Sequence, residues 1–154
     1  MTPPDDRLSA APVLPPPPGG RPAIAAVRRS GGTLLASGQV AVRDGRLIAT
    51  GRVGAEVDLD TARACAWQCA RNVLTAVREE TGTLAGVEAE TVIVYVASEP
   101  GFHDQHLVAD AATALFDEVL GGRHARAAIG VAALPTGSPV EVRATFGLRE
   151  PQAP

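Results

Sequence analysis

Residues 91–98, with the sequence TVIVYVAS, form a continuous apolar run that is rich in β-branched side chains. A run of this length and composition is typical of a central strand that is covered on both faces. We therefore expect a sheet with this segment near its middle. Each face of that sheet needs a layer of other residues to bury it.

Two segments have the apolar period of an amphipathic helix, and they flank this strand. The first is predicted over residues 61–81, with Asp60 as N-cap and Gly82 as stop, and the second over residues 105–120. The side chains expected to face inward are Ala62, Cys65, Cys69, Val73, Ala76 and Val77 in the first helix and Val108, Ala111, Ala112, Leu115 and Val119 in the second.

Further strands are predicted before the first helix and after the second. Residues 33–42 indicate a buried strand that Ser37 and Gly38 interrupt, and strands are expected at about 127–132 and 139–148. This order predicts an α+β fold, with a mixed sheet and both helices on one face. Because no helix remains for the other face, we expect the chain to associate with copies of itself.

Length and composition limit the classes of function. A chain of 154 residues is expected to form one domain, preceded by a mobile Pro-rich tail at residues 1–12. All 14 basic residues are arginines, so no lysine is available for a Schiff base. A net charge of −3 with 3% aromatic residues does not favour a nucleic-acid partner.

The same sequence favours a cytoplasmic location. It has no apolar run long enough to cross a membrane, and its first residues lack the pattern of a signal peptide. The two cysteines, Cys65 and Cys69, lie on the buried side of a predicted helix rather than in a disulfide framework. We therefore expect reduced thiols and no membrane partner.

The segment ARAAIGVAALPTGSPVEV, residues 125–142, places Arg126 and Glu141 among small and apolar residues. Ala128 and Gly130 would leave room beside Arg126, whose planar guanidinium suits a carboxylate. Glu141 would then hold or activate a water molecule. The alternative is that both charges are ordinary strand ends. A tight hairpin would place Glu141 opposite Gly130, about 13 Å from Arg126 at a rise of about 3.3 Å per residue.

Two other groups of residues are weaker candidates. His103 and His106, in the sequence HDQH, suggest a metal site, but ligands to complete it are lacking and Asp104 is more simply the N-cap of the second helix. No metal or other cofactor is therefore expected. Ser37 has no surrounding nucleophile motif, whereas Gly38 would expose backbone groups to a ligand.

Three motifs resemble the YjgF/RidA family of imine deaminases: SGQV at 37–40, CARNVLTAV at 69–77 and RHARAAIGVAALPTGSPVEV at 123–142. The likeness covers about residues 13–150, which we take as a single domain. A branch labelled as YjgF/chorismate-mutase-like endoribonucleases is indicated by LPPPP at 14–18, GRVG at 51–54 and FHDQH at 102–106.

The resemblance implies a chorismate-mutase-like fold, with a mixed six-stranded sheet and two helices on one face. It also implies a homotrimer whose sheets face inward, with ligand clefts between subunits. In such a family member, Arg126 would grip a substrate carboxylate, Glu141 would position water, and Gly38 would line the cleft. The implied reaction is hydrolysis of 2-imino or enamino acids to 2-keto acids and ammonia.

This chain departs from the deaminase pattern at three positions. Ile24 or a neighbour replaces a tyrosine, Asp110 aligns with an asparagine, and Ala128 replaces a cysteine found in many members. Ser37, Gly38, Asp110 and Ala128 are the expected substrate-binding residues beside catalytic Arg126 and Glu141. These departures leave open whether the chain is a deaminase, a non-catalytic protein that binds a metabolite or partner, or an enzyme redirected to secondary metabolism.

Overall fold

The computed structural model describes residues 3–10 and 23–149, so the predicted LPPPP segment and part of the predicted tail lie outside the described residues. Residues 4–10, within the predicted tail, form a short exposed helix that the sequence did not indicate. The helices are α1 (Pro4–Ala10), α2 (Leu59–Thr81) and α3 (Gln105–Leu120), with a 3₁₀ turn η1 (Pro135–Gly137). The strands are β1 (Val27–Ser30), β2 (Thr33–Ala36), β3 (Gln39–Val40), β4 (Val42–Arg43), β5 (Arg46–Leu47), β6 (Val87–Ala97), β7 (Ala125–Val131) and β8 (Val140–Leu148).

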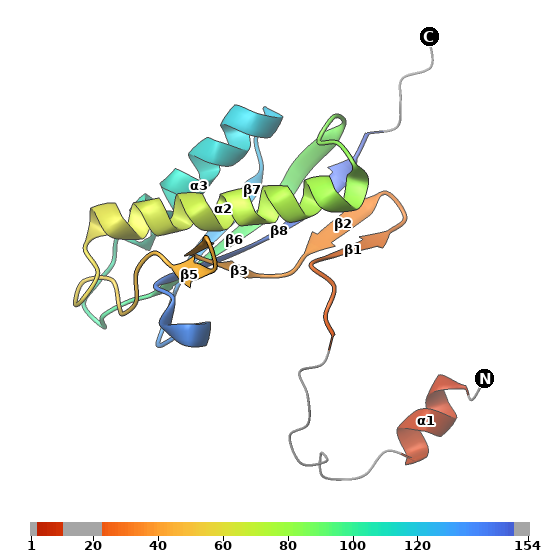
Figure 1. Ribbon diagram of the computed structural model, residues 1–154, viewed down its shortest axis with the longest axis horizontal. Helices are drawn as coiled ribbons and strands as arrows, with labels where there is room; N and C mark the ends of the chain where they lie inside the picture. Colours follow the sequence, from red (N-terminus) through yellow and green to blue (C-terminus); the bar gives the residue numbers. More distant parts are fainter. Residues whose placement is uncertain (1–2, 11–22, 150–154) are drawn as a thin grey trace.

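Six of these strands form one mixed sheet in the order β1-β2-β8-β6-β7, with β3 also paired to β8 (Figure 1). β6 and β7 are parallel, and the other pairs are antiparallel. The predicted strand at 33–42 is divided at Ser37 and Gly38 into β2 and β3, which both pair with β8. β6 is the long central strand that the apolar run at 91–98 predicted.

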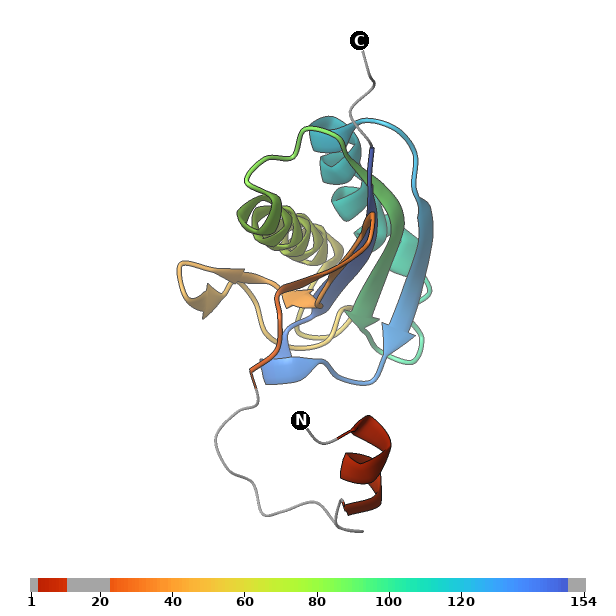
Figure 2. The same cartoon turned by 90° about the vertical axis from the view of Figure 1, so that its right-hand side faces the viewer.

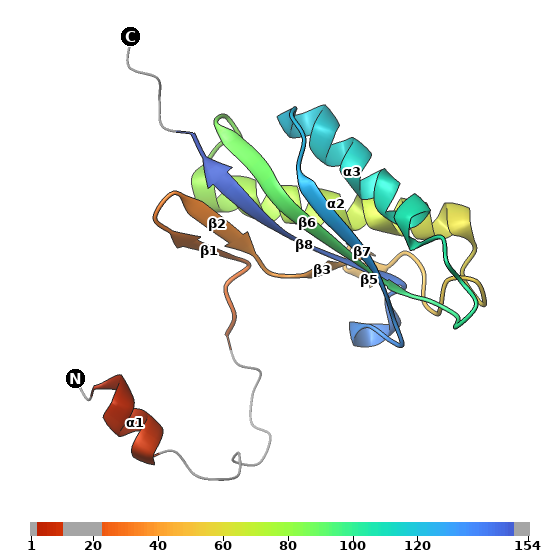
Figure 3. The same cartoon turned by 180° about the vertical axis from the view of Figure 1, so that it is seen from behind.

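Helices α2 and α3 lie side by side on one face of the sheet, as the sequence predicted (Figure 2). Val92, Val94 and Val96 of β6 point toward the helices and are buried. Ile93 and Tyr95, which alternate with them, point to the other face and are only half-buried. Seen from behind in Figure 3, no helix of the described residues covers that second face.

Helix α2 begins two residues earlier than predicted, and its N-cap is Asp58 rather than Asp60. The Asp58 carboxylate accepts a hydrogen bond of 2.8 Å from the backbone N–H of Thr61. Hydrogen bonding from the Thr61 side chain, and then from this N–H, lowers the pKa of Asp58. Asp60 lies in the first turn, where its charge interacts favourably with the helix dipole. Asp104 does occupy the N-cap position of α3, but its side chain makes no capping bond.

The buried helix faces follow the prediction except at the end of α3. Cys65 and Cys69 are fully buried, as expected, whereas Val119 is 45% exposed. Phe116 completes the buried stripe instead. Its ring packs against that of Phe146 on β8, with 6.0 Å between the two ring centroids.

We expect Phe146→Ala to lower the free energy of unfolding by about 3–5 kcal/mol, because it removes a fully buried ring and leaves a cavity below Phe116. Urea denaturation of both proteins measures the difference. Phe102→Ala is the matched control, since Phe102 is only partly buried against the same core. Equal losses for the two variants would contradict the placement of Phe146 at the centre of the core.

Candidate functional site

Glu141 lies on the sheet face that the helices leave open. On β8 it pairs with Val40 of β3 on one side and with Tyr95 of β6 on the other. Its neighbours Val140 and Val142 are buried on the helix side, so strand alternation directs Glu141 to the opposite face. Partial burial there raises the pKa of the Glu141 carboxyl group.

Gly38 allows the backbone between β2 and β3 to approach the Glu141 side chain closely. A Cβ atom at position 38 would lie 1.9 Å from Oε1 of Glu141. Any side chain at this position would therefore displace the carboxylate. The close approach to Glu141 is possible because glycine has no side chain. The predicted role of Gly38 in exposing backbone groups to a ligand stays a prediction.

A cavity of about 930 Å³ lies over this part of the open face. Besides Ser37, Gly38 and Glu141, its lining includes the polar side chains of Tyr95, Arg28 and Arg143. Sequence reasoning did not assign these three residues to the site. For two of them strand alternation could have given the signal, because Tyr95 must face away from Val94 and Val96, and Arg143 must share a face with Glu141.

Ser37 contributes to the cavity mainly by holding the chain that precedes β1. Its Oγ donates a hydrogen bond of 2.6 Å to the carbonyl oxygen of Ala25, and its backbone N–H donates to that of Ala26. Ile24, which follows the described start at residue 23, is exposed at the cavity edge. The hydroxyl of Ser37 therefore positions the segment that carries Ile24.

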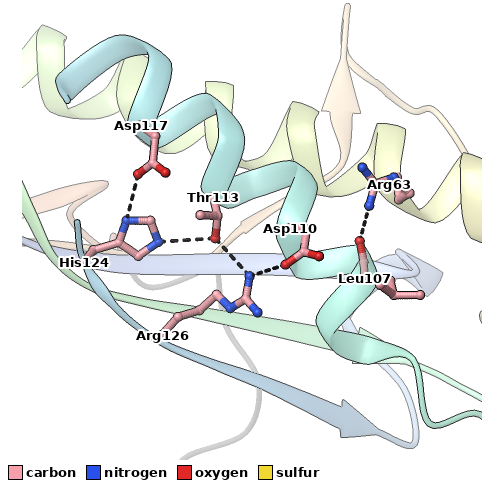
Figure 4. A network of polar contacts seen from close by, with 7 residues as sticks. All are labelled: Arg63, Leu107, Asp110, Thr113, Asp117, His124 and Arg126. Carbon is pink, nitrogen blue, oxygen red and sulfur yellow. Dashed lines mark hydrogen bonds and ion pairs between the residues drawn. The ribbon is translucent and has the colours of Figure 1, made fainter. Parts of the chain in front are cut away.

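Arg126 lies on the other side of the sheet, toward α3 (Figure 4). On β7 it pairs with Val92, whose side chain is buried under the helices, so Arg126 shares that face. Its Nη1 donates hydrogen bonds to Oδ1 of Asp110 at 2.7 Å and to Oγ1 of Thr113 at 3.1 Å. Arg126 is thus held against α3, with 25% of its side chain exposed.

His124 extends this polar network away from Arg126 (Figure 4). Its Nε2 lies 3.3 Å from Oγ1 of Thr113, and its Nδ1 lies 3.7 Å from Oδ1 of Asp117. Burial lowers the pKa of His124, with Arg126 acting in the same direction and Asp117 opposing it. At neutral pH the imidazole is therefore mainly uncharged.

The structure thus sorts the six predicted site residues into two groups. Ser37, Gly38 and Glu141 gather on the open face, whereas Arg126, Asp110 and Ala128 gather along β7 and α3 on the helix face. Within one chain, Arg126 and Glu141 do not share a pocket. The reason is that β7 and β8 do not form a hairpin: β6 lies between them, and the connection at 132–139 crosses its end.

His103 and His106 are both exposed near the start of α3. Within residues 3–10 and 23–149, no three His, Cys, Asp or Glu side chains come together where they would hold a metal ion. Across the same ranges, no helix is both long enough and apolar enough to span a bilayer.

Comparisons with known proteins agree on one family. The family described as Endoribonuclease L-PSP matches residues 22–146. Protein TCP17 of Trypanosoma cruzi is 40% identical over 123 residues, which is 77% of each chain. A protein of unknown function from Agrobacterium tumefaciens is 38% identical, with 82% of each chain covered and a TM-score of 0.80. Escherichia coli TdcF with bound serine shares the fold at 21% identity and a TM-score of 0.58, covering 86% of this chain and 93% of its own.

Proposed function

Because this chain belongs to the Endoribonuclease L-PSP family, as its YjgF/RidA motifs predicted, we propose that it binds a small carboxylate ligand between subunits and hydrolyses 2-imino or enamino acids. The observation that carries this proposal is the cavity on the open sheet face, in which Glu141 meets the backbone of Gly38. The family match covers most of the single domain proposed for residues 13–150.

The active assembly in this proposal is a homotrimer with inward-facing sheets. The open face supports it, because Leu35 and Ile129 expose 39% and 40% of their surface there, beside half-buried Ile93. A second copy laid on this face would bury these side chains. Within one chain Arg126 and Glu141 lie on opposite faces, but Arg126 is on the edge strand β7. In the proposed trimer this edge lies beside the Glu141 group of the next subunit.

Arg126 is the proposed carboxylate-binding residue of the composite site. A guanidinium forms paired, charge-assisted hydrogen bonds with a carboxylate, and the partial exposure of Arg126 leaves it accessible at the edge strand β7. TdcF, which has the same fold, holds serine, a small molecule with a carboxylate. This similarity supports a ligand of that class here.

Glu141 is the proposed general base. Burial raises its pKa, which makes it a better proton acceptor than an ordinary carboxylate. It would take a proton from water as the oxygen bonds to the imine carbon. That proton passes to nitrogen and leaves a carbinolamine. The new hydroxyl then gives its proton to nitrogen as the carbon–nitrogen bond breaks, and the products are a 2-keto acid and ammonia; an enamino acid first tautomerises to the imine.

Tyr95 offers the cavity a phenol that the first strand lacks. It lies opposite Glu141 in the β6–β8 pair, whereas Ile24 stands in the region where deaminases usually carry tyrosine. Tyr95 therefore provides a hydroxyl that donates to or accepts from a ligand in the same cavity. We assign it this supporting role in the proposed reaction.

The direct test is ammonia release from 2-aminoacrylate generated in situ. We expect the protein to accelerate release above the buffer rate, and Arg126→Ala to abolish the acceleration. Rates equal to buffer for both proteins would rule out deaminase activity. If calorimetry shows that a carboxylate binds without turnover, the result would instead favour a non-catalytic binding protein. The observation behind this alternative is the pairing of Arg126 with Asp110 in the free protein.

RNA cleavage is not the activity we propose, despite the family description. The chain has a net charge of −3 and few aromatic residues for stacking on bases.

We also propose a cytoplasmic location. Cys65 and Cys69 are free thiols in the core, and burial raises the pKa of Cys65 to about 11, so neither is suited to disulfide exchange.

We expect Ile129→Asp to shift the protein toward monomers, because it places a charge on the surface proposed to lie between subunits. Ile129 is already 40% exposed in the single chain, so folding is expected to survive. Light scattering after size-exclusion chromatography measures the mass. Val119→Asp is the matched control, since Val119 is similarly exposed on the helix side. A variant that keeps the wild-type mass would contradict this interface, as would a wild-type protein that is monomeric.

A further inference from the structure

Only one nitrogen of the Arg126 guanidinium is occupied in the free protein. Both hydrogen bonds, to Asp110 and Thr113, come from Nη1. Among the described residues, Nη2 and Nε make no hydrogen bond. One edge of the guanidinium thus remains for a carboxylate, and that carboxylate would bind beside Asp110 without displacing it.

The charges near this edge are unfavourable for a simple anion. Arg126 supplies one positive charge, and Asp110 supplies a negative charge in direct contact with it. His124, mainly uncharged at neutral pH, adds little, and Asp117 adds a second carboxylate behind it. An anion that reaches Arg126 is therefore attracted by one cation and repelled by two nearby carboxylates.

Asp110 itself has capacity for a further donor. Its Oδ1 accepts from Arg126, while 48% of its side chain remains exposed. A carboxylate accepts several hydrogen bonds, so a positively charged N–H group would bind it alongside Arg126. Arg126 and Asp110 are thus a cation and an anion side by side, complementary to a ligand that carries the opposite pair.

We propose that Asp110 makes the Arg126 site selective for small acids with a positively charged nitrogen beside the carboxylate, such as α-amino and protonated α-imino acids, over uncharged-nitrogen or oxygen analogues. The ligand carboxylate binds the open edge of Arg126, and the ligand N–H group donates to Asp110. This inference rests on the proposed function, because it requires Arg126 to bind the carboxylate. It would also favour a protonated imine over its 2-keto acid product, which carries no such nitrogen.

A purely structural role for Asp110 makes a different prediction. If Asp110 only positioned Arg126, its negative charge would not matter. An asparagine at 110 still accepts from Nη1 through its amide oxygen, so Asp110→Asn removes the charge and keeps the contact. Thr113 continues to hold the same nitrogen. Ligand preference therefore separates a charge effect from a positioning effect.

The test compares serine with glycerate, which has a hydroxyl group in place of the ammonium group at the same carbon. Isothermal titration calorimetry of the wild-type protein is expected to give an affinity for serine about 10-fold higher than for glycerate. Asp110→Asn is expected to lower this ratio by about 10-fold, chiefly by strengthening glycerate binding. Glu118→Gln, which removes a charge from an exposed position on the same helix, should leave the ratio unchanged.

The outcomes separate this inference from the function on which it rests. If both probes bind, Arg126→Ala abolishes binding, and the ratio is the same in the wild type and Asp110→Asn, then selectivity by Asp110 is wrong while carboxylate binding by Arg126 stands. If the ratio of serine to glycerate affinity falls as much in Glu118→Gln as in Asp110→Asn, the loss of any negative charge explains the change. The inference about Asp110 is then also wrong. If neither probe binds any of the proteins, both the inference and the proposed function fail.

Discussion

Arg126→Ala is expected to weaken binding of a small carboxylate ligand by about 10²- to 10⁴-fold, the value of two lost charge-assisted hydrogen bonds. Calorimetric titration with serine measures the change. The variant should remain folded, because Arg126 and Asp110 are both partly exposed and an ion pair of this kind contributes little to stability. Loss of affinity with unchanged thermal unfolding is therefore the expected combination.

Arg123→Ala provides the control for Arg126→Ala. Arg123 is exposed just before β7, so its removal changes the net charge equally without touching the contacts of Asp110 and Thr113. We expect Arg123→Ala to bind serine like the wild type. If the two variants bound equally well, a general electrostatic attraction rather than a carboxylate site at Arg126 would account for binding.

Glu141→Gln is expected to reduce imine hydrolysis by about 10²- to 10⁴-fold, because the amide has the same size but cannot accept a proton from water. Ammonia release under saturating substrate measures the rate, and calorimetry should show that ligand binding persists. Glu79→Gln, an exposed change on α2, should retain the full rate. A fully active Glu141→Gln would exclude Glu141 as the base.

The pH dependence gives Glu141 a second signature. Its pKa is raised by burial, so the wild-type rate should fall as the pH is lowered through that raised pKa, and the fall should begin above the ordinary range of a glutamic acid. Folding stability depends on pH in the opposite direction to the rate. Burial favours the protonated form, so the stability contribution is present at low pH and is lost as the pH rises through the raised pKa. Glu141→Gln should lack this loss in urea denaturation at several pH values.

The elements with strong local signals could be predicted from the sequence. The apolar period of α2 and α3 and the alternation in β8 depend on neighbouring residues, so a single chain reveals them. The error at Asp60 has a local cause too: Asp58 and Asp60 are both good N-caps, and only the extended backbone at Asp58 decides between them. These patterns did not distinguish the candidate site residues from ordinary strand residues, and it was the family motif that favoured their assignment to a site.

The arrangement around Arg126 could not be predicted in the same way. In β7 the residues after Arg126 are small or apolar on both faces, so no alternation indicates which face Arg126 occupies. The turn sequence LPTGSP suggests a hairpin, but the parallel pairing of β7 with β6 is a long-range choice that separates β7 from β8. The contact with Asp110 follows from that choice.

The separation of Arg126 and Glu141 onto opposite faces has a genetic consequence in the proposed trimer. Each site would take its arginine from one subunit and its glutamate from the next. Subunits carrying Arg126→Ala and subunits carrying Glu141→Gln would each be inactive alone. A closed ring of three that contains both kinds would always hold one site with both native side chains, so two defective alleles would complement each other in one cell.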